Sequence, residues 1–352
     1  MVTERYDAAA LRAFASDLLV AAGMTPARAD VVARILVEGD LMGHTTHGLQ
    51  LMGPYLKSIA KNEMLLDGEP EIIASRPVTE LWDGKNLPGP WLVENGFARA
   101  TEMALEFGTG TVVVRRCHHI GCLAAYMRPI AEKNLLGLLV SSDPANSTVS
   151  PFGGITPVYS PNPVAACFPT EGDPVILDIS MSTTTNGLCM RTMKAEKQLP
   201  HRWVKDPDGQ VSDDPATVFS DPPGSILPLG GIDSGHKGFA LGLLVEALTG
   251  GLAGYGRADG TRDWGATVYV QVQDIEAFSG ASGFKRESSW LADACRESKT
   301  APADDPVRLP GEAGLVRRRQ ALKDGVELFP GIMTMLDEWA DKFGVQRPSP
   351  LN

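Results

Sequence analysis

Two short apolar runs, separated by a stretch with helical spacing, constrain the fold of this chain more than any other feature. Residues 111–114 are a β-branched run, residues 119–133 have helical spacing, and residues 135–141 are again a short apolar run. Such runs are typical of strands buried on both faces of a sheet, and a helix between two of them makes a βαβ unit. The pattern predicts an α/β protein in which these two strands pair in parallel within a sheet covered by helices.

Helical spacing also dominates the first ~65 residues, where apolar residues recur at intervals of three and four. A first helix is expected to end at Gly23, and a second to begin with Thr25 as its cap and a proline in its first turn. Residues 43–60 continue the pattern, although Gly53 and Pro54 must kink or restart the helix.

Downstream of the βαβ unit, irregular and regular segments alternate. The expected elements are a proline-rich wrap at 144–174, a strand at 175–177 that ends in Asp178, a glycine-rich loop at 224–238, a helix from Phe239, a half-buried strand at 267–272, an exposed excursion at 293–305, and C-terminal helices around 315–322 and 331–339. Ligands of such sheets bind at the carboxyl ends of strands, so the residues after Val114 are the first place to look for chemistry.

Length and charge exclude several classes of function. At ~150 residues per domain, 352 residues suggest roughly two domains, with room for a cleft between them. The formal net charge of −11 repels phosphate backbones and anionic lipids, so nucleic acid is not an expected partner. The apolar stretches are shorter than the ~20 residues of a membrane helix, and the N-terminus lacks the order of a signal peptide. A cytoplasmic protein is expected.

No glycine motif matches a nucleotide-binding fingerprint. A Rossmann loop follows a strand, whereas residues 108–110 precede one and residues 250–256 have the wrong spacing. Residues 230–238 approach a phosphate-binding loop, but His236 stands at the lysine position and Gly238 at the Ser/Thr position. Two readings remain: a simple turn, or a glycine loop that delivers Lys237 at a helix N-terminus to hold a phosphate.

Histidines and cysteines supply the remaining candidates for chemistry. His44 and His47 are three residues apart, which suits half of a metal site or, with the neighbouring Thr46 hydroxyl orienting His47, an acid/base histidine. No second cluster with ligand spacing completes a metal site, so none is expected. His119 follows the first strand of the βαβ unit. The five cysteines are scattered and read as buried thiols, with a reactive thiol beside the histidine pair as the alternative, at Cys117 or Cys122.

Seven segments match the motifs of one family in register along nearly the whole chain. They are Asp-Leu-Met-Gly at 40–43 through Thr-His-Gly-Leu at 46–49, His-Ile-Gly at 119–121 with Tyr126, Asn-Pro at 162–163, Asp-Ile-Ser-Met-Ser at 178–182, Pro-Leu-Gly-Gly at 228–231, Lys-Gly at 237–238, and Arg-Leu-Pro-Gly-Glu at 308–312. The chain thereby resembles the malate/L-lactate dehydrogenase family, which is distinct from the Rossmann lactate dehydrogenases and includes sulfolactate and ureidoglycolate dehydrogenases and Δ1-piperideine-2-carboxylate reductase.

The resemblance implies a non-Rossmann, L-sulfolactate dehydrogenase-like α/β fold with a helical N-terminal region and a mixed-sheet domain covered by helices. It also implies an intertwined homodimer, or a dimer of dimers, with the active site between domains. The corresponding divisions are 1–75, a helical segment that carries the acid/base histidine and packs with the C-terminal helices, 76–310, a nicotinamide-binding domain, and 311–352, the C-terminal helices.

Residue roles follow from the same resemblance. His47 would donate or accept the proton, assisted by Thr46, which stands where the family usually has serine, and by His119. NAD or NADP would be lined by His119, Ile120, Gly121, Cys122, Leu123, Asp178, Ile179, Ser180, Lys237, Gly238, Arg308, Pro310, Gly311 and Glu312. An arginine run at 317–319 favours NADP if it faces the cofactor, and is otherwise a solvated face.

The substrate positions depart from the family pattern. Leu51 replaces an arginine that would pair with a substrate carboxylate, Pro161 replaces a threonine, and Asn186-Gly187-Leu188 replaces a more polar set. Together with His44, the residues Leu51, Pro161, Asn186 and Gly187 are the substrate-binding candidates.

Leu51 cannot hold a carboxylate, which leaves two explanations. Another cation holds the acid, the candidates being His44, Arg116 and Arg191, or the substrate is a larger, less anionic keto or imine compound with an apolar part. The leading hypothesis is hydride transfer between NAD(P)H and a 2-oxo acid other than simple malate or lactate. Alternatives are a cyclic imine reductase, a catalytically impaired nicotinamide-binding relative, and a metal hydrolase built on His44 and His47.

Overall fold

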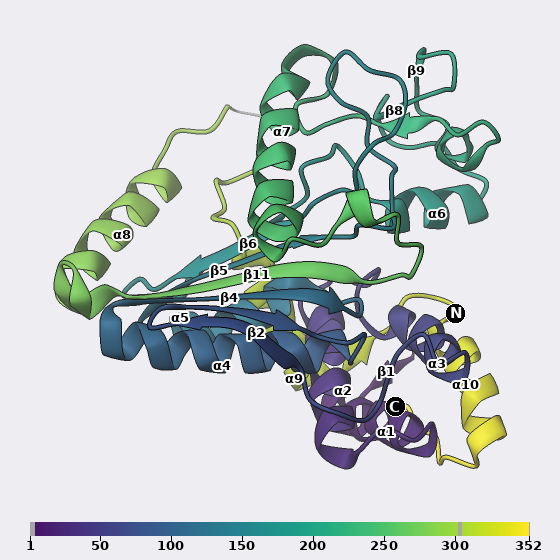
Figure 1. Ribbon diagram of the computed structural model, residues 1–352, viewed down its shortest axis with the longest axis horizontal. Helices are drawn as coiled ribbons and strands as arrows, with labels where there is room; N and C mark the ends of the chain where they lie inside the picture. Colours follow the sequence, from purple (N-terminus) through teal and green to yellow (C-terminus); the bar gives the residue numbers. More distant parts are fainter. Residues whose placement is uncertain (1–3, 302–304, 352) are drawn as a thin grey trace.

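The computed structural model describes residues 4–301 and 305–351, and its centre is a seven-stranded mixed sheet (Figure 1). In spatial order the strands are β2 (Glu71–Arg76), β3 (Thr79–Asp83), β4 (Thr109–Cys117), β11 (Ala266–Asp274), β5 (Leu135–Ser142), β6 (Val164–Phe168) and β7 (Val175–Ile179). Both predicted strands of the βαβ unit are present, as β4 and β5.

The predicted parallel pairing of these two strands is wrong, because β11 lies between them and pairs antiparallel with both. Val268, Val270 and Val272 of β11 are fully buried, so this strand is central, not half-buried. The helix predicted at 119–133 is reduced to η2 (Leu123–Tyr126) and α5 (Met127–Ala131). Among the described strands, the parallel ladder is the one between β3 and β4.

Helices cover both faces of the sheet. α4 (Gly89–Phe107) packs on β4 and β11 over the largest apolar core, and α5 lies on the same side (Figure 1). The opposite face is covered by α7 (Gly231–Glu246) and the π-helical turn Ala247–Gly251 that follows it.

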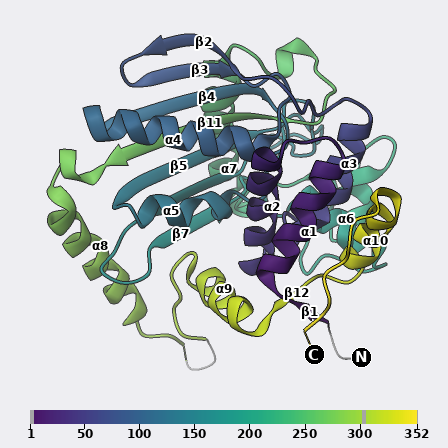
Figure 2. The same cartoon turned by 90° about the horizontal axis from the view of Figure 1, so that it is seen from below.

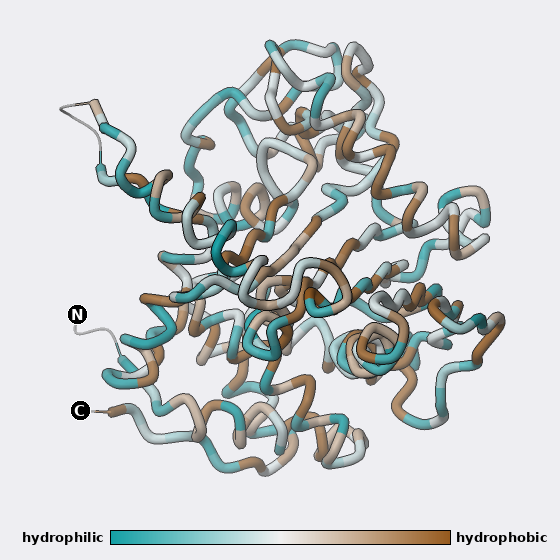
Figure 3. Tube along the Cα trace, turned by 90° about the vertical axis from the view of Figure 1, so that its left-hand side faces the viewer, coloured by the Kyte–Doolittle hydropathy of each residue, from teal (hydrophilic) through white to brown (hydrophobic). Residues whose placement is uncertain are grey.

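A second core joins the two ends of the chain. It is formed by α1 (Ala8–Ala21), α2 (Pro26–Leu41), α3 (Met52–Ala60) and α10 (Ile332–Phe343), and α9 (Glu312–Asp324) packs on α2. Strand β1 (Arg5–Tyr6) pairs with β12 (Val326–Glu327), so both termini lie on the same side of the molecule (Figures 2 and 3). Pro26 occupies the first turn of α2, but Thr25 makes no side-chain cap bond.

The remaining elements form a small lobe and a projecting helix. They are α6 (Asn186–Lys194), β8 (Val204–Lys205), β9 (Val211–Ser212), β10 (Ser225–Ile226), α8 (Gly280–Arg296) and the 3-10 turns Pro215–Phe219, Arg257–Asp259 and Ile275–Ala277. The predicted excursion at 293–305 therefore begins as the last turn of α8, and residues 302–304 lie outside the described residues. Among the helices described, none is long and apolar enough to cross a membrane.

Two further helix predictions need correction. Residues 43–48 form a turn and not a helix, followed by the 3-10 turn η1 (Leu49–Leu51), and α3 restarts with Gly53 and Pro54 in its first turn. Helix α7 begins at Gly231 rather than near Phe239, so the glycine-rich segment is its first two turns. Within this helix, glycine is needed at position 238 for close packing, because a Cβ there would lie 2.4 Å from the carbonyl oxygen of Leu229.

Candidate active site

His47 lies on a tight turn directly after α2. The turn is closed by the His47 amide, which donates to the carbonyl of His44 at 2.8 Å, and by the Leu49 amide, which donates to the buried Asp40 carboxyl at 2.7 Å. The three-residue spacing predicted that His44 and His47 share one face of a helix. This prediction is wrong, because both residues lie on a turn. The Thr46 hydroxyl lies 2.8 Å from Nδ1 of His47, which leaves Nε2 of His47 available for proton transfer.

The surroundings of His47 keep its ring neutral. Burial lowers its pKa, the Asp178 carboxylate opposes this shift, and the neighbouring His44 and Arg191 lower the pKa of His47 further. A neutral imidazole with one nitrogen oriented by a hydroxyl is suited to accept a proton and to return it.

His119 lies beside His47 and contacts it ring to ring. Its ring is stacked on His47 with centroids 6.0 Å apart and planes at 23°. The Gly121 amide donates to Nδ1 of His119 at 3.2 Å, so in the neutral ring the proton is on Nε2. Tyr55 donates to the carbonyl of His119 at 2.9 Å and fixes the backbone beside the ring.

Trp264 was not found from the sequence, although its ring centroid is 4.8 Å from that of His119. It comes from the loop before β11, so no local motif signals it. His118 packs between Tyr55 and Trp264, and burial lowers its pKa to about 4. Neither of its ring nitrogens has a partner among the described residues, so His118 is a packing residue here.

Two predicted cofactor segments contact strand β7 and so lie beside the third, 178–180: residues 119–123 near its end at Asp178, and residues 308–312 near its start at Ile176. The Ala124 amide, in η2, donates to Asp178 at 2.9 Å, and Cys122 lies beside the same carboxylate. The Ile176 amide donates to the carbonyl of Pro310 at 3.2 Å, which brings the segment 308–312 against β7. The structure therefore gathers His119, Ile120, Gly121, Cys122, Leu123, Asp178, Ile179, Ser180, Pro310, Gly311 and Glu312 in one region, with Arg308 exposed at its end.

Lys237 and Gly238 come from helix α7, and Gly238 is linked to the segment after β7 through Leu229, whose amide donates to the carbonyl of Met181 at 3.0 Å. Because α7 begins at Gly231, Lys237 lies on its second turn with an exposed side chain, and the prediction that it sits at a helix N-terminus is wrong. Gly238 is buried against Leu229.

One of the predicted substrate positions lies directly against the turn that carries His47. A Cβ on Gly187 would lie 3.4 Å from that of Thr46, so the start of α6 packs on the turn. Leu51 is partly buried and packs against the helical core of the N-terminal region, and the Pro161 carbonyl accepts from Met181 at 2.7 Å. Asn186 donates to Asn146 at 3.3 Å.

Of the three candidate cations, Arg116 is held in an ion pair, in which it donates to Asp83 at 2.8 Å. Arg191 lies at the turn, where it donates to the Thr45 hydroxyl at 2.8 Å and to the Gln50 side chain, and its guanidinium stacks on a phenylalanine ring at 3.6 Å. His44 is the third and is partly exposed.

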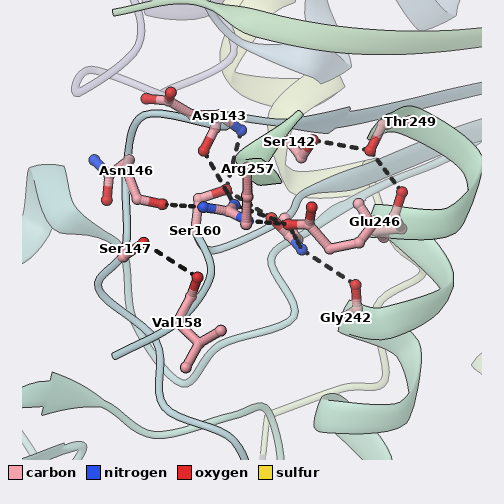
Figure 4. Close-up of polar contacts among 12 residues, drawn as sticks. Ser142, Asp143, Asn146, Ser147, Val158, Ser160, Gly242, Glu246, Thr249 and Arg257 are labelled. Atoms are coloured by element: carbon pink, nitrogen blue, oxygen red, sulfur yellow. Dashed lines mark hydrogen bonds and ion pairs between the residues drawn. The ribbon is translucent and has the colours of Figure 1, made fainter. Parts of the chain in front are cut away.

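A partly buried polar network holds the start of the proline-rich wrap, residues 144–174 (Figure 4). Arg257 is at its centre and donates to the carbonyls of Asn146 at 2.6 Å and Asp143 at 3.0 Å and to Glu246 at 2.8 Å. Burial raises the pKa of Asp143 to about 6. Since Asn146 also accepts from Asn186, the network supports the start of α6, and no sequence signal identified Arg257.

The cysteines are mostly buried, and two of the three arginines at 317–319 are ion-paired. Four of the five thiols are buried and Cys295 is partly exposed, as buried thiols were predicted. Arg318 donates to Glu38 at 2.6 Å and Arg319 to Asp173 at 2.9 Å, while Arg317 is exposed.

Comparison with known proteins extends these observations. A family model described as malate/L-lactate dehydrogenase matches residues 6–337. The chain is 28% identical over 344 residues to a malate dehydrogenase of Pyrococcus horikoshii, which covers 96% of this chain and 94% of that protein. It is likewise 28% identical over 332 residues to a Δ1-pyrroline-2-carboxylate reductase of Ancylobacter novellus, covering 92% and 93%. The crystal structure of malate dehydrogenase from Entamoeba histolytica has the same fold, with a TM-score of 0.93 over 99% of this chain and 100% of that chain at 23% identity.

Proposed function

Because the chain belongs to the malate/L-lactate dehydrogenase family, we propose that this oxidoreductase transfers a hydride between NAD(P) and a 2-oxo or 2-hydroxy acid, with His47 as the acid/base. The observation that carries the proposal is the geometry of the turn: Thr46 holds Nδ1 of a neutral His47, whose ring stacks on His119 beside the segments that converge on β7. One face of the site thus has a proton carrier and the other a set of backbone segments for a cofactor.

The residues at the end of β7 fit a nicotinamide cofactor. The segments 119–123, 178–180 and 308–312 would hold it, and when bound it supplies or accepts the hydride. In the reductive direction Nε2 of His47 gives a proton to the carbonyl oxygen, and in the oxidative direction it takes the proton from the hydroxyl. Thr46 keeps the ring oriented through both steps.

The substrate is proposed to be larger and less anionic than malate or lactate. Leu51 supplies an apolar side chain where a carboxylate would need a cation, and Arg191 already donates to Thr45 and Gln50. For a substrate that does carry a carboxylate, Arg191 would be the nearest balancing charge, because it acts on both His47 and Asp40.

Reduction of a cyclic imine is the second candidate function. It is favoured by the Ancylobacter novellus relative, which is as similar to this chain as the malate dehydrogenase is. A protonated His47 is equally suited to an imine nitrogen, because both reactions place one proton on the atom bonded to the carbon that receives the hydride.

A homodimer is proposed from the outward face of α7. Leu241, Leu243 and Leu244 are exposed there, and a cluster of large apolar side chains on one helix is typical of a protein interface. Size-exclusion chromatography with light scattering would give twice the monomer mass.

The test of the proposed function begins with cofactor binding. Titration of the purified chain with NADH and NADPH should show saturable binding of at least one, and a panel of 2-oxo acids and cyclic imines should then identify the substrate. Absence of binding to both cofactors would refute the proposal. Binding without turnover across the panel would instead favour an impaired relative.

A further inference from the structure

Three potential metal ligands come together from separate parts of the fold, next to His47. His44 comes from the turn after α2, Cys122 precedes η2, and Asp178 lies on β7. One donor atom of each lies within 4.8 Å of the others, and Sγ of Cys122 is 3.7 Å from Oδ2 of Asp178.

The donor types favour zinc over a hard cation. An imidazole nitrogen, a thiolate sulfur and a carboxylate oxygen are the ligands that Zn²⁺ takes in tetrahedral sites, whereas Mg²⁺ and Ca²⁺ prefer oxygen alone. With zinc bonds of ~2.0 to 2.3 Å, adjacent tetrahedral ligands are roughly 3.5 Å apart, close to the observed sulfur to oxygen distance.

The surroundings of these side chains also suit a bound ion. Asp178 accepts the Ala124 amide at 2.9 Å, which fixes the carboxylate as an outer hydrogen bond fixes a metal ligand. Cys122 is buried and His44 is partly exposed on its turn, so the ring of His44 is free to close the remaining distance.

We propose that His44, Cys122 and Asp178 bind one zinc ion and that this ion excludes the nicotinamide cofactor. As the bond to sulfur forms, the Cys122 thiol releases its proton to solvent, and a water keeps the fourth position of the ion. The exclusion rests on the proposed function, in which Cys122 and Asp178 belong to the segments that hold the cofactor. The site would thus make the enzyme sensitive to thiophilic divalent metals.

Zinc binding is tested without any assay of activity. The full chain, stripped of metal and kept reduced, is titrated with Zn²⁺ in competition with a chromophoric chelator. One ion per chain is expected, with affinity lowered roughly tenfold or more in Cys122→Ser and in His44→Ala. The matched controls Cys295→Ser and His201→Ala should bind zinc as the unmodified chain does. Circular dichroism checks each fold, and His44, on a partly exposed turn, keeps the test valid if Cys122→Ser is unstable.

The exclusion of cofactor is tested by NADH titration with and without saturating Zn²⁺. Zinc should raise the apparent Kd for NADH at least tenfold in the unmodified chain and much less in His44→Ala. No stoichiometric zinc, zinc binding indifferent to both substitutions, or NADH binding indifferent to zinc would each overturn the proposal. A chain that binds one zinc ion through these residues but binds neither NADH nor NADPH would overturn the proposed function and the cofactor exclusion, while the zinc titration would still support the metal site.

Discussion

The His47 turn, residues 43–51, and helix α7 carry residues predicted for the same site, but their packing differs. Three side-chain contacts hold the turn. Asp40 accepts from the Leu49 amide, the Thr46 hydroxyl contacts His47 within the turn, and Arg191 donates to Thr45. Helix α7 packs on the sheet with one face only, and Leu241, Leu243 and Leu244 on its outward face are 44%, 51% and 53% exposed.

The difference distinguishes a part of the site whose contacts all come from one chain from a helix whose outward face has no cover in the single chain. The proposed acid/base group, His47 with Thr46, is held by contacts within the chain. The surroundings of Lys237 on α7 depend on whatever covers that helix, which we propose is a second copy of the chain. Substitutions in the turn should therefore change catalysis in proportion to the contacts they remove, whereas substitutions on the outside of α7 should change assembly.

The largest effect is expected at His47. His47→Ala should lower kcat by ~10²–10⁴ because the proton carrier is lost, while NADH affinity and thermal stability change little. Steady-state kinetics and NADH titration measure this, with His201→Ala as the matched control. Retention of more than a tenth of kcat would show that another group moves the proton.

Asp40 makes the stability of the turn depend on pH. Burial raises its pKa from 3.8 to about 7, so between these values the folded chain holds a proton that the unfolded chain has released. The free energy of unfolding should therefore fall as pH rises from about 4 to 7, by at most roughly 1.4 kcal/mol per pH unit from this group.

Asp40→Asn should remove that part of the fall and keep an acceptor for the Leu49 amide. Urea unfolding at several pH values between 4 and 7.5 measures it. Parallel profiles for the two proteins would contradict the assignment.

Arg191 sharpens the comparison because it ties the turn to α6. Arg191→Met should lower kcat/KM roughly tenfold, since bonds to Thr45 and Gln50 from a charged donor are lost. It should also move the His47 limb of the pH profile to higher pH, because Arg191 lowers the pKa of His47. Arg191→Lys, which keeps the charge, should retain the pH profile; a profile unchanged in both variants would mean that Arg191 is only structural.

A smaller, positive effect is expected at Leu51. Leu51→Arg should improve turnover of simple 2-oxo acids several-fold by adding a partner for the carboxylate, at some loss of stability because Leu51 packs on the helical core. Comparison of kcat/KM for pyruvate and oxaloacetate measures it. Unchanged or lower activity would count against the assignment of Leu51 to the substrate site.

The smallest effect on the single chain is expected on α7. Leu243→Gln with Leu244→Gln should shift the mass measured by light scattering from dimer to monomer, yet change the stability of the monomer by only about 0.5 kcal/mol per site. An unchanged mass would place the interface elsewhere.

Local patterns were sufficient for the parts of the molecule that neighbours in sequence determine. The apolar runs at 111–114 and 135–141 predicted β4 and β5, and adjacency alone placed the Thr46 hydroxyl against His47. The pairing of the strands was missed because β11 comes more than 120 residues after β5, and strand order depends on that distant segment.

The same limit applies to α7 and to the site. The glycines of α7 predict a loop because glycine has a low helix propensity, but Gly238 packs so closely on Leu229 that glycine is necessary at this position of the helix. Trp264 and Arg257 come from segments that carry no local motif, so only the folded chain identifies them, whereas Arg191 was already one of three candidate cations in the sequence and the fold shows which one lies at the turn.

The position of β11 also determines how the protein can be made. Strands β4 and β5 each have one neighbour until residues 266–274 leave the ribosome, so the growing chain holds two half-sheets with open apolar edges from the end of β7 at residue 179 until β11 is made. Closing the centre last gives the sheet a high contact order and slow folding, and leaves incomplete chains prone to aggregate. Translation pauses before residue 266 should therefore leave more aggregated chain than pauses of the same duration after residue 274.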